Sequence, residues 1–85
     1  MKVRYSEPSL KQLRKIGKPE AKRILEYMKE IEKLENPKNK GKALVENLNG
    51  LWRYRVDDWR VICDINEEEI LIDVLRIGHR REIYR

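Results

Sequence analysis

The chain has 85 residues, 20 of them Lys or Arg and 15 Asp or Glu, and its formal net charge is +5. One cysteine and one histidine exclude an internal disulfide and a zinc site, and no apolar run approaches the roughly 18 residues of a membrane span. We therefore expect a cytoplasmic protein with one domain over residues 1–85 and no metal or other cofactor, whose positive charge favours an anionic partner such as a nucleic acid.

The beginning of the chain predicts a strand followed by a helix. Val3 and Tyr5 share one face of a short strand over residues 2–5. The Ser-Glu-Pro sequence that follows is typical of a helix start, because serine caps a helix and proline is tolerated in its first turn. This helix is expected from Pro8 to Ile16, and Gly17 ends it.

A second, amphipathic helix is expected from Pro19 to the Asn36-Pro37 pair that ends it. Its apolar residues recur at spacings of three and four positions, and they are Ala21, Ile24, Leu25, Met28, Ile31 and Leu34. The two helices form a hairpin that needs a sheet to cover. The next segment, residues 38–50, reads as a loop in which the apolar residues pack beneath the sheet, namely Leu44, Val45 and Leu48.

From Leu51 onward the apolar pattern changes to a period of two, which predicts three strands. They span Leu51–Val56, Trp59–Ile65 and Ile70–Ile77, and residues 78–85 form a short polar tail. The expected order is therefore β-α-α-β-β-β. This is an α+β fold with a two-helix hairpin packed on one face of a mostly antiparallel four-stranded sheet.

A two-residue turn at Asp57-Asp58 fixes the register of the first hairpin. One face, under the helices, receives the apolar and aromatic pairs Val56–Trp59, Tyr54–Val61 and Trp52–Cys63. Both tryptophans are thus expected in the core, not as platforms for stacking bases. On the other face Arg55 lies opposite Arg60, and Arg53 lies opposite Ile62.

Two like charges directly opposed across a strand pair destabilise a sheet, so folding alone gives no reason for Arg55 and Arg60. An anion bound between the two side chains would explain both arginines. The planar guanidinium group suits phosphate, because it can donate two parallel hydrogen bonds. The alternative is a pair of solvated arginines that splay apart or pair with Asp57 or Asp73.

A second group of polar residues lies in the tail. If the last strand pairs with residues 59–65, its end brings Arg80 and Tyr84 toward the Arg55–Arg60 pair. The alternative for Tyr84 is a ring that packs on the sheet edge with its hydroxyl in water.

Residues 51–62, LWRYRVDDWRVI, together with residues 77–85, IGHRREIYR, resemble the RelE family of toxin–antitoxin systems. The resemblance covers essentially the whole chain and implies the microbial-ribonuclease-like fold of the RelE/ParE superfamily. It further implies the toxin of a type II system, an endoribonuclease that cleaves mRNA in the ribosomal A site by attack of a 2′-OH on the adjacent phosphate. Its implied partners are the ribosome, mRNA and a RelB-like antitoxin that silences it, with no membrane and no metal.

Carried over by position, the resemblance implies a set of catalytic residues, which are Arg53, Arg55, Arg60, Arg80 and Tyr84. Apart from the resemblance, His79 is a candidate acid or base because it is the only histidine of the chain, and the basic tail residues Arg81 and Arg85 are expected to bind RNA. Some family members carry lysine where this chain has Arg53 and Arg55. An arginine practically cannot lose its proton, so the residue that takes the first proton stays open.

Three rival readings share parts of this pattern. A ParE-type toxin has the same fold and inhibits DNA gyrase, but it does not need the basic residues and the terminal tyrosine. A non-catalytic RNA-binding relative would bind RNA with a steep salt dependence and cut nothing. A structural domain with incidental charge would do neither.

Overall fold

The computed structural model describes residues 1–83. Strand β1 (Lys2–Tyr5) leads into helices α1 (Glu7–Lys15) and α2 (Lys18–Lys33). A 3-10 turn (Pro37–Asn39), strand β2 (Lys42–Ala43) and a second 3-10 turn (Glu46–Leu48) follow. The chain then forms β3 (Trp52–Val56), β4 (Trp59–Asn66) and β5 (Leu71–His79).

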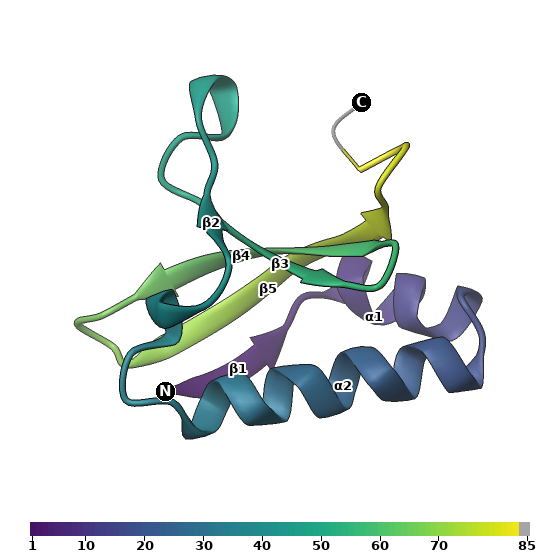
Figure 1. The fold of residues 1–85 in the computed structure, drawn as a ribbon, viewed down its shortest axis with the longest axis horizontal. Coiled ribbons are helices and arrows are strands. Elements are labelled where there is room, and N and C mark those ends of the chain that lie inside the picture. Colours follow the sequence, from purple (N-terminus) through teal and green to yellow (C-terminus); the bar gives the residue numbers. More distant parts are fainter. Residues whose placement is uncertain (84–85) are drawn as a thin grey trace.

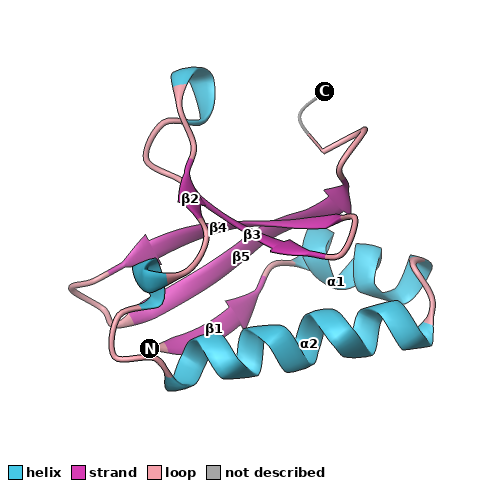
Figure 2. Cartoon of the chain, in the orientation of Figure 1, coloured by secondary structure: helices cyan, strands magenta, loops and turns pink. Residues whose placement is uncertain are grey.

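The strands form one sheet in the order β1-β5-β4-β3-β2, in which β1 is parallel to β5 and the other neighbours are antiparallel. Both helices lie on the same side of this sheet (Figures 1 and 2). The α+β class and the position of the helix hairpin are confirmed. The predicted number of strands is wrong, because Lys42–Ala43 lies in the segment expected to be a loop and pairs with β3 as a fifth strand.

The helix boundaries follow from the capping residues. The side chain of Ser6 accepts a hydrogen bond from the backbone N–H of Ser9 at 3.2 Å, as a helix N-cap does. Its hydroxyl also donates to the carbonyl of Leu75 at 2.8 Å and so fixes the start of α1 to β5. Gly17, with a φ of 92°, separates the two helices.

The core lies between α2 and the covered face of the sheet. The fully buried side chains of α2 are Ile24, Met28 and Ile31, and those of the sheet include Tyr54, Val61, Cys63, Ile72, Val74 and Ile77. The register of the β3–β4 hairpin is the predicted one at all five pairs from Trp52↔Cys63 to Val56↔Trp59. Trp52 and Trp59 pack against this core, which confirms the prediction for both.

The chain between Lys40 and Leu51, here called the arm, rises from the side of the sheet that carries no helix (Figure 1). Its base is held by two hydrogen bonds, from Trp52 Nε1 to the carbonyl of Lys40 at 2.8 Å and from Leu44 N–H to the carbonyl of Leu51 at 3.0 Å. The expectation that this segment packs beneath the sheet is wrong, since Val45 is 70 % exposed.

Several kinds of chemistry have no support in residues 1–83. No helix there is long and apolar enough to cross a membrane, and no group of three or more His, Cys, Asp or Glu side chains is placed to hold a metal ion. Cys63 is buried, and burial raises the pKa of its thiol above the usual value. It therefore stays a neutral thiol and is not a nucleophile.

Candidate functional site

The face of the sheet without helices carries two cross-strand rows of side chains, here called the basic face. The upper row is Arg55–Arg60–Gly78 on β3, β4 and β5. The lower row is Lys42–Arg53–Ile62–Arg76 on β2, β3, β4 and β5. Neither the lower row as a unit nor Arg76 was predicted from the sequence.

Arg76 was missed because of a β-bulge in β5. The register shifts between Ile62 and Cys63, which pair with Arg76 and Val74 and leave Leu75 as the extra residue. Strict alternation from Val74 would put Arg76 on the covered face. A signal was present in the sequence, because strict alternation from Val74 would bury Arg76 and expose Ile77, and the opposite is favourable.

Arg55 and Arg60 lie directly opposite each other, as predicted, but their environments differ. Arg55 is exposed, whereas Arg60 is only 7 % exposed. Arg60 Nη1 donates to the carbonyls of Asp57 and Trp59, each at 3.1 Å. The hairpin turn thus holds the Arg60 guanidinium in place, while Arg55 remains available to an anion.

The two aspartates that the alternative interpretation offered as partners for this pair bind other cations. Asp57 accepts from Arg23 Nε of α2 at 2.9 Å, and Asp73 accepts from Arg4 Nε of β1 at 2.8 Å. Within residues 1–83 neither Arg53 nor Arg55 forms an ion pair. Arg53 Nε is in addition buried without a hydrogen-bond partner there, which is uncommon for a side-chain donor.

Arg80 follows β5 directly and lies at the hairpin turn. Its backbone N–H donates to the carbonyl of Asp58 at 2.8 Å, and its Nη1 lies 3.7 Å from Asp58 Oδ1. The strand end therefore returns to the turn, as the sequence predicted. The ion pair is solvent-exposed, so an incoming phosphate can compete with the aspartate for the guanidinium.

His79 is not brought to the Arg55–Arg60 pair. It pairs with Trp59 in the register, and the two rings meet edge to face with centroids 5.6 Å apart. Trp59 Nε1 donates to Glu20 of α2 at 2.7 Å, so both rings lie on the side of the helices. Arg81 is exposed, and its N–H donates to His79 Nδ1 at 3.3 Å.

The end of the described chain folds back over the upper row. Ile83 is 5 % exposed, and a Cβ added to Gly78 would lie 2.7 Å from Ile83 Cδ1. Arg76 Nη2 also donates to the carbonyl of Ile83, at 3.4 Å. The two remaining predicted site residues, Tyr84 and Arg85, lie outside the described residues.

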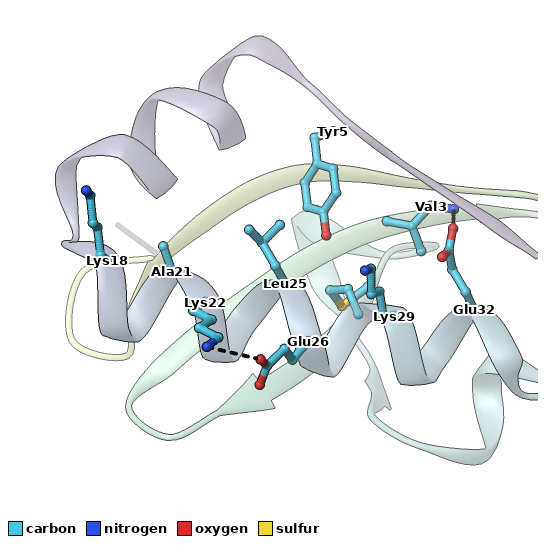
Figure 3. A pocket seen from close by; sticks show the side chains of 10 residues that line it. Val3, Tyr5, Lys18, Ala21, Lys22, Leu25, Glu26, Lys29 and Glu32 are labelled. Atoms are coloured by element: carbon cyan, nitrogen blue, oxygen red, sulfur yellow. Dashed lines mark hydrogen bonds and ion pairs between the residues drawn. The ribbon is translucent and has the colours of Figure 1, made fainter.

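A second surface is a groove of about 610 Å³ between α2 and the outer edge of β1 (Figure 3). Val3, Tyr5 and Leu25 give it an apolar lining, and Leu25 is 40 % exposed. Glu32 accepts from the N–H of Val3 at 2.8 Å on that open edge. Burial, with smaller contributions from Cys63 and Glu32, raises the pKa of Tyr5 to about 12, so its phenol is neutral.

Solved structures with the same fold are toxins and toxin–antitoxin complexes. The RelBE2 complex of Mycobacterium tuberculosis is similar with 27 % identity and a TM-score of 0.71, over 92 % of this chain and 95 % of that chain. The RelE–RelB complex of Pyrococcus horikoshii OT3 is 25 % identical with a TM-score of 0.72, over 94 % of each chain. The isolated RelE toxin of E. coli, 16 % identical, has a TM-score of 0.71 over 96 % of this chain and 88 % of that one, which shows the fold alone. No curated protein sequence matches the chain.

A helix hairpin on one face of a mixed sheet, with these structural matches, defines a toxin of the RelE/ParE superfamily. The model of the ParE toxin of type II toxin–antitoxin systems (parDE) matches residues 3–84. The chain therefore belongs to this ParE toxin family, and the resemblance to the superfamily inferred from the sequence is confirmed.

Proposed function

We propose that the chain is a ribosome-dependent endoribonuclease that cleaves mRNA in the ribosomal A site and thereby inhibits translation. The observation that carries the proposal is the direct opposition of Arg55 and Arg60 on the uncovered face, with Arg80 at the adjoining turn. The opposition of two like charges across a strand pair is unfavourable in the free protein, and a phosphate bound between Arg55 and Arg60 would offset that repulsion. A gyrase inhibitor has no need of this cluster.

In the proposed reaction the 2′-oxygen of one ribose attacks the adjacent phosphorus. A 2′,3′-cyclic phosphate forms, the bond to the 5′-oxygen of the next nucleotide breaks, and that oxygen leaves as a 5′-OH after it takes up a proton. Arg60, already oriented by the turn carbonyls, and Arg80 stabilise the charge that grows on the nonbridging oxygens. Arg55 and Arg53 orient the RNA backbone.

Proton transfer is assigned to Tyr84. The arginines keep their protons at any accessible pH, and His79 lies on the helix side of the sheet. Tyr84 is the residue with a dissociable proton in the catalytic set that the family resemblance implies, and it stands in the sequence among Arg80, Arg81 and Arg85. Arg81 and Arg85 are proposed to bind the RNA backbone on either side.

The proposed site relies on the ribosome for substrate positioning. Ordinary general acid–base catalysis pairs two well-placed groups, whereas the charged groups of the two rows within residues 1–83 are guanidinium and ammonium groups. Holding the mRNA in a reactive geometry can contribute roughly 7–11 kcal/mol, which compensates for a weak acid–base pair. Free RNA is therefore expected to be cut poorly.

The first test is primer extension on a defined mRNA in a translating extract, with the wild type beside Arg80→Ala and Tyr84→Phe. We expect cuts within codons that require ribosomes and that fall at least about 100-fold in rate in both variants. Arg14→Ala, an exposed arginine on α1, is the matched control and should cut like the wild type. An uncut message with translation intact would reject the nuclease function.

A gyrase inhibitor is the second candidate, and the match to the ParE family model favours it. It would act by binding a protein, so its activity would survive loss of the arginine cluster. Supercoiling by purified gyrase in the presence of the protein distinguishes the two candidates. Inhibition that persists in Arg80→Ala would favour this second function.

A RelB-like antitoxin is the proposed partner, and the groove beside β1 is its proposed binding site. The relatives at 27 % and 25 % identity were solved as complexes with their antitoxins. β1 is an edge strand of the sheet and its outer side borders the groove, so an extended segment can lie along it. The net charge of +5 favours an acidic segment with apolar side chains directed at Leu25 and Tyr5.

The Leu25→Asp variant tests whether the antitoxin binds in this groove. Because Leu25 is already 40 % exposed, the variant should fold, but the charge in the apolar groove should weaken binding of the cognate antitoxin at least about 10-fold. Titration calorimetry measures the change, and mRNA cleavage by the free toxin should be unaffected. The control is Ile70→Asp, an exposed apolar residue away from the groove. Equal affinities for the two variants would place the antitoxin elsewhere.

A further inference from the structure

The lower row of the basic face, Lys42–Arg53–Ile62–Arg76, repeats the arrangement of the upper row. Lys42 lies directly opposite Arg53, so like charges are again opposed across a strand pair. Arg53 and Arg76 flank Ile62 on its two sides, about 9.5 Å apart across two strand spacings. Arg76 Nη2 contacts the Ile83 carbonyl, so the Arg76 side chain has to turn over Ile62 to share one anion with Arg53.

The donors of this row are largely unused. Lys42 and Arg53 form no ion pair or side-chain hydrogen bond within residues 1–83. Arg53 Nε is buried there without an acceptor. Arg76 is exposed, and its one hydrogen bond in the described part of the chain is the 3.4 Å contact to the Ile83 carbonyl. A buried donor without an acceptor is unfavourable, so Arg53 gains by turning toward an anion on this row.

Neighbouring groups limit where such an anion can lie. The two rows are two residues apart along the strands, about 6.6–6.8 Å, a span that one nucleotide of an RNA strand can bridge. Beyond the lower row along β4 and β5 the next residues on this face are Asp64 and Asp73, which lie opposite each other. Asp73 is paired with Arg4, but Asp64 is exposed and would repel a further phosphate. The basic surface thus has room for two phosphates in this direction.

We propose that Arg76, with Arg53 and Lys42, forms a second phosphate-binding subsite that holds the phosphodiester next to the one being cut. The inference rests on the proposed nuclease function and adds a residue, Arg76, and a ligand group to it. The upper row holds the scissile phosphate, and the lower row fixes its neighbour. The RNA backbone is thereby held at two points, which sets the angle at which the 2′-oxygen meets the phosphorus.

The test is single-turnover cleavage of a synthetic mRNA on programmed ribosomes by the wild type, Arg76→Gln, Arg76→Lys and Arg14→Gln. Arg14→Gln removes the same charge from α1, outside the basic face. In parallel, each linkage next to the cut is replaced by an uncharged methylphosphonate. We expect Arg76→Gln to lower the rate about 10-fold and Arg76→Lys to restore part of it. One neutral linkage should slow the wild type and leave Arg76→Gln unchanged, since the contact is already lost.

Two outcomes separate failure of this inference from failure of the function. If Arg76→Gln cuts like Arg14→Gln while Arg80→Ala is inactive, the subsite is wrong and the nuclease function stands. If the wild type does not cut, binding of a short labelled single-stranded RNA is measured against salt. Loss of one phosphate contact should reduce the slope of log K against log salt by about 0.7 in Arg76→Gln. If the slope in Arg76→Gln equals that of the wild type, Arg76 does not contact a phosphate and the second subsite is rejected.

Discussion

Replacing Arg55 by alanine is expected to lower the rate of ribosome-dependent mRNA cleavage about 100-fold while leaving the melting temperature unchanged or slightly raised. Arg55 is exposed and has no ion pair in residues 1–83, so the folded protein loses little with it. The substitution also removes a like-charge pair with Arg60, which relieves repulsion. Loss of one preorganised donor at a developing anion has an effect of this size on the rate.

Arg60→Ala provides the contrast, because the same loss of charge falls on a buried side chain. Its guanidinium donates to the carbonyls of Asp57 and Trp59, so alanine leaves these turn carbonyls without that donor. We expect a loss of about 1–3 kcal/mol in the free energy of unfolding together with the loss of cleavage. Single-turnover cleavage and thermal melting, measured on both variants, separate the two effects. A melting temperature that falls several degrees in Arg55→Ala would show that Arg55 has a structural role instead.

The sequence was sufficient for the β3–β4 hairpin and for most of the upper row. Alternation from Trp52 to Val56 and a two-residue turn leave a single register that buries the apolar side chains, because a shift by one residue would expose all of them. Once that register is set, Arg55 must face Arg60. The return of Arg80 to the turn follows from the antiparallel pairing of β4 with β5.

The lower row depended on two features that have no strong local signal. β2 is only two residues long, and its pairing with β3 depends on a tertiary contact, so period-two analysis could not find it. The bulge at Leu75 reverses the facing of Arg76. The extra residue also explains His79, since the same shift puts it beside Trp59 on the helix side. The sequence shows these residue types, but the face of the sheet on which they lie depends on the bulge and on the tertiary pairing of β2.

Gly41→Ala is expected to destabilise the protein by at least about 2 kcal/mol more than Gly50→Ala, and to disturb the basic face. Both glycines have a positive φ, 83° and 93°, which strains any residue with a Cβ. The two positions differ in the room available to a Cβ, because nothing lies within 4 Å of a Cβ added at Gly50. At Gly41 it would lie 2.4 Å from the backbone carbonyl oxygen of Arg53 and 2.6 Å from Trp52 Nε1. Backbone of a central hairpin cannot shift cheaply, so overpacking adds to the strain.

The consequence reaches the lower row because Gly41 precedes Lys42 at the base of the arm. Relief of the overlap with Arg53 requires β2 to move away from β3, which separates Lys42 from Arg53 and breaks the hydrogen bond from Trp52 Nε1 to Lys40. Urea unfolding of Gly41→Ala, Gly50→Ala and the wild type gives the difference in stability, and tryptophan fluorescence reports on Trp52. Equal stabilities for the two variants would mean that the arm does not rest against β3, and Lys42 would then have no place in the second phosphate subsite.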